Sequence, residues 1–274
     1  MTNNDILVLG GTGKTGRRVV ARLAERGVPV RVGARGGATR FDWLEESTWE
    51  AALTGVRAVY LVYLQDLSSA DAPAHIGGFL RLARERGVER VVMLSARGWE
   101  TAGPAEQAVR ESGLAWTILR PTWFAQNFSE DMFLPYVLGG EVRLPTRDGR
   151  EPFIDAEDIA EVAAVALTED GHTGQVYELS GPELLTFGDA VAAISSAGGP
   201  EARYTPISSE EFIEDLIAAG LTAEEAPVVD GLLGCIARGE NAHLSDGVRR
   251  VLGREPRGFA EFAARTVAED GWKG

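Results

Sequence analysis

The stretch ILVLGGTGKTG, residues 6–16, decides the fold of this chain. Residues 6–9 form a short apolar run typical of a buried strand, and residues 16–26 carry apolar side chains at helical spacing. Between them Gly10, Gly13 and Gly16 have the spacing G-x-x-G-x-x-G. The first glycine permits a tight turn, the second lets a diphosphate approach the backbone, and the third lets helix and strand pack closely. Together with the positive helix N-terminus, the pattern predicts a dinucleotide-binding loop.

The loop supplies the first set of candidate cofactor-binding residues, namely Gly10, Thr12, Gly13, Lys14, Thr15 and Gly16. A P-loop interpretation fails, because Gly13-Lys14-Thr15 would need a glycine at position 8, where Val8 stands. Lys14 is one of only two lysines in the chain, so its place inside the loop is more informative than that of an ordinary surface lysine.

Strand and helix patterns alternate through the first half of the chain. Strands are predicted at 28–32, 40–42, 58–63, 90–94 and 116–119, and helices at 71–86 and 104–112. Ser47 and Glu50 have the spacing of a capping box, as do Ser208 and Glu211, and Thr222 and Glu225. Helices at 155–167 and 186–195, the second with Asp189 completing a cap, and a strand at 176–179 follow. The alternation predicts an α/β Rossmann fold, a doubly wound parallel sheet covered on both faces.

The predicted organisation is a dinucleotide-binding domain over residues 1–150, to which residues 151–185 add a strand and a helix. Residues 186–274 are predicted to form a smaller, mainly helical substrate-binding lobe.

Composition excludes several classes of protein. The 274 residues include 27 basic and 41 acidic side chains, for a formal net charge of −14, which disfavours a nucleic-acid partner. No apolar stretch is long enough to span a membrane, and the N-terminus lacks the features of a signal peptide, so we expect a cytoplasmic protein. The single cysteine, Cys235, is predicted to be a small buried apolar residue. Oligomeric state is left open.

The end of the second predicted strand bears on the choice of cofactor. NAD-binding units place a carboxylate there for the ribose 2′-hydroxyl, whereas this chain has Arg35 and no carboxylate before Asp42. A guanidinium can grip a 2′-phosphate, so NADP(H) is the predicted cofactor. Trp43 is a candidate wall for the adenine, with a core aromatic as the alternative.

At this point the sequence resembles the NmrA-like atypical short-chain dehydrogenases/reductases from residue 5 to residue 265. The resemblance is carried by GGTGKTG, Arg35, RFDW at 40–43, TILRPTWF at 117–124 with Asn127 and Phe128, DAEDIA at 155–160 and GREP at 253–256. The loop and the FDW segment look closest to ergot-alkaloid-type reductases. The resemblance implies a Rossmann sheet, a small C-terminal substrate lobe and NADPH where a member is an enzyme. It also implies that some members bind the dinucleotide only as sensors.

The proton relay of ordinary short-chain dehydrogenases is missing. Neither Lys14 nor Lys273 is preceded four residues earlier by a tyrosine, so Tyr-x-x-x-Lys does not occur. An iminium ion or a quinone can nevertheless accept hydride without that relay. The weaker candidates for a catalytic role are Ser95 and Glu106, although an exposed helix carboxylate is the more ordinary role for Glu106, and a loop cap for Ser95.

Further candidates lie where parallel strands end, the edge at which such sheets bind ligands. Cofactor contacts are predicted for Tyr63, Ser95 and Pro121, and substrate contacts for Tyr63, Trp99, Trp123, Phe124 and Asn127. An aromatic pocket in an acidic protein suits a flat or cationic small molecule, although each of these aromatics could equally be core. The three histidines are too scattered for a predicted metal site, and Asp155 and Asp158 are interpreted as helix caps.

Two functions follow. The first is an NADPH-dependent reductase of an imine or iminium, a quinone or a conjugated carbonyl. The second is a non-catalytic dinucleotide sensor that acts through a protein partner.

Overall fold

The computed structural model describes residues 5–272, which divide into two compact units. The sheet unit comprises the chain up to Pro121 together with Ala156–Leu179 and Asp246–Arg254. The helical unit comprises Thr122–Asp155, Ser180–Ser245 and the residues from Glu255 onward. The return of a strand and a helix from residues 151–185 was predicted, but this division differs from the predicted boundaries in two places: Thr122–Asp155 belongs to the helical unit, and Asp246–Arg254 belongs to the sheet unit.

The sheet unit contains a seven-stranded sheet in the order β3-β2-β1-β4-β5-β6-β8, with every neighbouring pair parallel. The α/β Rossmann prediction is therefore confirmed. The strands are β1 (Asp5–Leu9), β2 (Val30–Ala34), β3 (Thr39–Arg40), β4 (Val56–Leu61), β5 (Arg90–Leu94), β6 (Ala115–Pro121) and β8 (Gln175–Leu179). Strands β1 and β4 are almost completely buried, as expected of central strands covered on both faces.

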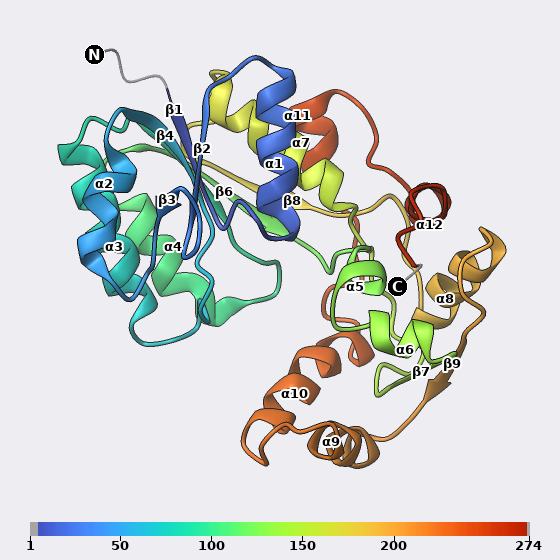
Figure 1. The fold of residues 1–274 in the computed structure, drawn as a ribbon. Coiled ribbons are helices and arrows are strands. Elements are labelled where there is room, and N and C mark those ends of the chain that lie inside the picture. The colour runs from blue at the N-terminus through green and yellow to red at the C-terminus, as the bar shows by residue number, and fades with distance from the viewer. Residues whose placement is uncertain (1–4, 273–274) are drawn as a thin grey trace. The chain divides into compact units, whose positions relative to one another are not determined.

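Helices cover both faces of this sheet (Figure 1). On one face lie α1 (Lys14–Glu25), α7 (Ala156–Thr168) and α11 (Gly247–Leu252). On the other lie α2 (Trp49–Leu53), α3 (Ala72–Glu85) and α4 (Gly103–Arg110), with the short 3-10 turns η1 (Glu46–Thr48) and η2 (Glu100–Ala102) before α2 and α4. Helix α7 packs against both α1 and α11, and its alanine-rich sequence allows this close approach.

Most predicted caps are confirmed. Thr186 and Ser208 each accept a hydrogen bond from the third helical residue, and the carboxylate of that residue bonds back in a reciprocal box. Thr222 and Glu225 form the same pair of bonds. The predicted box at Ser47 is wrong, because the Ser47 hydroxyl donates to Glu45 and the segment begins as a 3-10 turn.

The helical unit is built around aromatic side chains. It contains a two-stranded parallel sheet of β7 (Glu141–Leu144) and β9 (Arg203–Pro206). Its helices are α5 (Asn127–Glu130), α6 (Leu134–Leu138), α8 (Phe187–Ser196), α9 (Ser209–Ala218), α10 (Glu225–Ala237) and α12 (Phe259–Ala268). Phe128 is the hub of its core, in ring contact with Phe133, Phe153, Phe187 and Phe259.

Two further predictions concerned the burial of Cys235 and the presence of helices able to span a membrane. Cys235 is half-buried rather than buried, because it lies on a partly exposed face of α10, and its thiol donates to the Leu232 carbonyl. Over residues 5–272 no helix combines the length and the apolar character that crossing a membrane requires.

Candidate dinucleotide site

The glycine loop has the geometry that its sequence predicts. Gly10 has a φ of +64°, a conformation that favours glycine, and its carbonyl accepts a hydrogen bond from the Gly13 amide at 2.9 Å. Helix α1 begins immediately after Gly13, without a side-chain cap. A Cβ on Gly16 would lie only 2.2 Å from the Gly10 carbonyl oxygen. The loop therefore folds tightly over the start of α1, and its helix N-terminus suits a diphosphate.

A small cavity lies beside this loop, at the end of β2. It has a volume of about 120 Å³ and is lined by Gly10, Gly33, Ala34, Arg35, Phe41, Asp42, Trp43, Leu64 and Gln65. The structure thus brings together the predicted residues Gly10, Arg35 and Trp43. Arg35 is exposed, which leaves its guanidinium accessible to a ligand. Sequence reasoning missed Leu64 and Gln65, because nothing in a loop sequence shows that it folds back beside the glycine loop.

Trp43 is both a core residue and a wall of this cavity. Only 2% of its surface is exposed, and its indole N–H donates to the Val62 carbonyl at 3.0 Å. Its ring makes edge contacts with Phe41 and Tyr63, with centroids 5.1 and 5.0 Å apart. An adenine could therefore meet only a small part of the indole.

Tyr63 belongs to the same side of the sheet unit as Trp43. Its side chain is buried, which raises the pKa of the phenol, and the hydroxyl lies 2.8 Å from His75 Nδ1. This placement groups Tyr63 with the Arg35 cavity.

Ser95 and Glu106 meet in a buried polar cluster after β5. The Ser95 hydroxyl donates to Glu106 Oε1 at 2.8 Å. Arg120 donates to both carboxylate oxygens, through Nε at 2.8 Å and Nη2 at 2.5 Å, and Arg110 donates to Oε2 at 2.8 Å. The interpretation of Glu106 as an exposed helix carboxylate is wrong, since it is 2% exposed. Sequence reasoning also missed Arg110 and Arg120, the second an arginine at the end of a buried strand.

The electrostatics of this cluster keep Glu106 ionised. Burial by itself raises the pKa of Glu106, but hydrogen bonds from Arg120, Ser95 and Arg110, with the charge of Arg120, bring it below its ordinary value. A carboxylate held in this way by two guanidinium groups is a poor proton shuttle, so the geometry argues against the acid–base role considered for Glu106.

The segment after β5 also holds the other predicted contacts of the sheet unit. Trp99 packs partly against the core and lines a cavity of about 230 Å³ together with Ala96, Gly98, Glu100, Gly103 and Arg120. Pro121 is the buried last residue of β6, and its carbonyl accepts a hydrogen bond from the Arg97 amide at 3.0 Å. Arg97 is itself buried and lies 3.8 Å from the Glu178 carboxylate.

The three remaining substrate candidates belong to the helical unit. The half-buried Trp123 ring stacks on Phe133, with centroids 5.8 Å apart, and Phe124 pairs with Ile154 in an isolated bridge. Asn127 begins α5 and is 8% exposed. Their predicted role in binding substrate stays a prediction.

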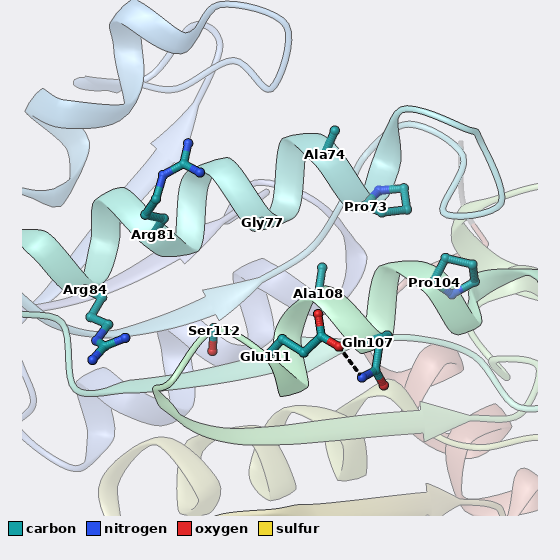
Figure 2. A pocket seen from close by; sticks show the side chains of 10 residues that line it. All are labelled: Pro73, Ala74, Gly77, Arg81, Arg84, Pro104, Gln107, Ala108, Glu111 and Ser112. Carbon is teal, nitrogen blue, oxygen red and sulfur yellow. Dashed lines mark hydrogen bonds between the residues drawn. The ribbon is translucent and has the colours of Figure 1, made fainter.

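The larger cavity shown in Figure 2, about 670 Å³ in volume, lies between α3 and α4 and contains none of the predicted site residues. The acidic pair at the start of α7 is buried. Asp155 accepts a hydrogen bond from Gln126 and pairs with Arg265, and Asp158 pairs with Arg254. Their interpretation as simple helix caps is therefore incomplete. Within residues 5–272 no group of three or more potential ligands could hold a metal ion.

Comparison with known proteins identifies the family. A family of NAD(P)H-binding proteins matches residues 10–170 of the chain. The chain belongs to this family. Its resemblance to the NmrA-like atypical short-chain dehydrogenases/reductases is confirmed by relatives that align along nearly the whole chain.

Two relatives and one solved structure illustrate this. The uncharacterized oxidoreductase YesF of Bacillus subtilis is 36% identical, with 98% of this chain and 97% of that protein aligned. The agroclavine dehydrogenase of Claviceps fusiformis is 32% identical, with coverage of 94% and 96%. The crystal structure of an NADPH-dependent quinone oxidoreductase from Escherichia coli superposes with a TM-score of 0.79 at 22% identity, covering 96% of this chain and 99% of that one, and so shows the same fold.

This member of the NmrA-like family is an NAD(P)H-dependent oxidoreductase. Its own residues fit the cofactor, because the glycine loop leaves no room for a side chain at Gly16 and the adjoining cavity carries an accessible arginine.

Proposed function

We propose that this protein is an NADPH-dependent reductase that transfers hydride to an imine or iminium, a quinone or a conjugated carbonyl, without a Tyr-x-x-x-Lys relay. The observation that carries this proposal is the Ser95–Glu106 pair. The Ser95 proton is directed at Glu106, and Glu106 is itself an ionised acceptor. Neither group can readily protonate a developing alkoxide, which disfavours simple ketones as substrates.

The preference for NADPH is supported by Arg35. A 2′-phosphate is doubly charged near neutral pH, and a planar guanidinium can bind it with two parallel hydrogen bonds. Arg35 lines the cavity beside Gly10 and is exposed, so it has the freedom to make such a contact. Asp42 lines the same cavity, but its carboxylate accepts a hydrogen bond from the Leu44 amide.

Hydride transfer to an iminium ion or a quinone requires no proton-donating side chain. The bound cofactor supplies hydride. An iminium ion that accepts it becomes a neutral amine, and a quinone becomes a delocalised anion that water can protonate. The protein's contribution is to bind and orient the reactants and to exclude water. The substrate contacts proposed for Tyr63, Trp99, Trp123, Phe124 and Asn127 stay predictions.

Turnover assays test this proposal. The protein is incubated with NADPH and with separate panels of cyclic imines, quinones and simple ketones, while NADPH absorbance is followed. We expect consumption with members of the first two panels and none with the ketones. Measurable NADPH binding without turnover on any panel would refute the reductase and favour the sensor.

A further inference from the structure

The hydrogen-bond direction at Ser95 is fixed by its partner. Glu106 receives four hydrogen bonds, of which three come from the guanidinium groups of Arg110 and Arg120. An ionised carboxylate can only accept, and a serine hydroxyl has one proton and two lone pairs. Because the proton of Ser95 is directed at Glu106, the hydroxyl has only acceptor capacity left for a ligand.

Ser95 and Arg35 lie on opposite sides of β1 in the strand order. Ser95 directly follows β5, and β4 separates β5 from β1, which leads into the glycine loop. Two strand spacings put the ends of β1 and β5 about 10 Å apart. A dinucleotide with its diphosphate on the loop and its 2′-phosphate at Arg35 would therefore extend its nicotinamide half toward β4 and β5. Ser95 is only 5% exposed, so a ligand could touch no more than a small part of it.

We propose that Ser95 is a positioning residue that accepts a hydrogen bond from the carboxamide N–H of the nicotinamide, and that Glu106 sets this polarity. The inference rests on the proposed cofactor but not on the identity of the substrate. A carboxamide that donates to Ser95 would be restrained from turning its carbonyl oxygen toward the serine. The opposite arrangement, in which Ser95 donates to a substrate carbonyl, would break the bond to Glu106.

The variant Glu106→Gln is expected to reverse the polarity. If the amide nitrogen took the place of Oε2, it would face N–H groups of both Arg110 and Arg120. In the place of Oε1 it faces one N–H of Arg120 and the Ser95 hydroxyl, which can accept from it. The second arrangement has fewer donor–donor conflicts. It releases the Ser95 proton, which can then be donated to a ligand.

The test compares NADP⁺ with its 3-acetylpyridine analogue, in which a methyl group replaces the amide nitrogen and the carbonyl is kept. Dissociation constants of both ligands are measured by calorimetry for the wild type and the variants Ser95→Ala and Glu106→Gln. Ser112→Ala is the matched control, since Ser112 lies just beyond α4 and its hydroxyl accepts from the Leu114 amide. Losing one hydrogen bond should weaken binding of the analogue to the wild type by about three- to tenfold.

The quantity compared is the dissociation constant of the analogue divided by that of NADP⁺. In Ser95→Ala and in Glu106→Gln we expect this ratio to fall by the same three- to tenfold factor, to about one. In Ser112→Ala we expect it to stay at the wild-type value. A merely structural role of Ser95 would change both affinities together and leave the ratio unaltered, which would overturn the inference. Should Glu106→Gln fail to fold, the Ser95→Ala ratio decides by itself. Absence of NADP⁺ binding to the wild type would instead refute the proposed cofactor, so the two failures are distinguishable.

Discussion

Replacing Gly16 by alanine tests whether the close packing of the glycine loop is needed to bind the cofactor. The new Cβ would lie 2.2 Å from the Gly10 carbonyl oxygen and 2.8 Å from both the Gly10 carbonyl carbon and the Gly11 Cα. All three are backbone atoms, so no side chain can rotate out of the way. Since favourable contacts between carbon atoms need roughly 3.5 Å, the loop must move by about 1 Å.

We expect this movement to affect stability and binding together. Overpacking of this kind costs about 1–3 kcal/mol of folding free energy. A loop displaced by about 1 Å no longer presents its amides correctly to a diphosphate, so the dissociation constant for NADPH should rise at least tenfold, or about 1.4 kcal/mol. Urea denaturation measures the first effect and calorimetry the second.

Gly103→Ala is the matched control for this experiment. Gly103 begins α4 and has a negative φ, and a Cβ added to it would meet no neighbouring atom within 4 Å. Its replacement should therefore leave both quantities near the wild-type values. If Gly16→Ala bound NADPH as tightly as Gly103→Ala and were equally stable, the assignment of this loop to the diphosphate would be refuted.

Three other substitutions probe the rest of the sheet unit. Arg35→Glu should weaken the binding of NADPH by at least about tenfold and change the binding of NADH little, because only NADPH has the 2′-phosphate. Arg26→Glu, which breaks an exposed ion pair with Glu169, is the control. Equal losses of affinity for both cofactors in Arg35→Glu would contradict the assignment. The pKa of Glu106 in the folded protein lies below its ordinary value of 4.5. Its ionised form therefore stabilises the fold at a pH above 4.5, and this stabilisation is lost as the pH falls through the lowered pKa. The difference in unfolding free energy between wild type and Glu106→Gln should therefore shrink as the pH is lowered from about 6 to about 3, a range that spans the ordinary pKa of a glutamate. A constant difference would show that the charge of Glu106 does not contribute to stability. Trp43→Ala should cost about 3–5 kcal/mol in urea denaturation because the indole is enclosed by aromatic rings, and a loss under about 1 kcal/mol would argue against its place in the core.

The cofactor loop was predictable because its signals are local. The turn at Gly10, the close approach at Gly16 and the helix that follows lie within a few residues of one another. The prediction for Arg35 was made in the same way, since the carboxyl end of the second strand has a known position relative to the loop. The family resemblance depended on these segments and on others farther along the chain, at residues 117–124, 155–160 and 253–256.

The polar cluster around Glu106 was not predictable to the same extent. Its partners stand on the loop after β5, on α4 and on β6, and only the packing of α4 against the sheet brings them together. An isolated glutamate on a short amphipathic helix gives no sign that it is buried. The domain boundary was missed for a related reason, because residues 122–155 belong to the helical unit and α11 belongs to the sheet unit, which no local pattern in the chain indicates.

By itself the sequence determined the parallel sheet, the dinucleotide loop and the lack of a Tyr-x-x-x-Lys relay, because each depends on residue type and on spacing along the chain. The tertiary structure decided which polar groups are paired and in which direction their hydrogen bonds run. Burial makes that difference: a carboxylate removed from water must find donors, and those donors are selected by proximity in space rather than by order in the chain.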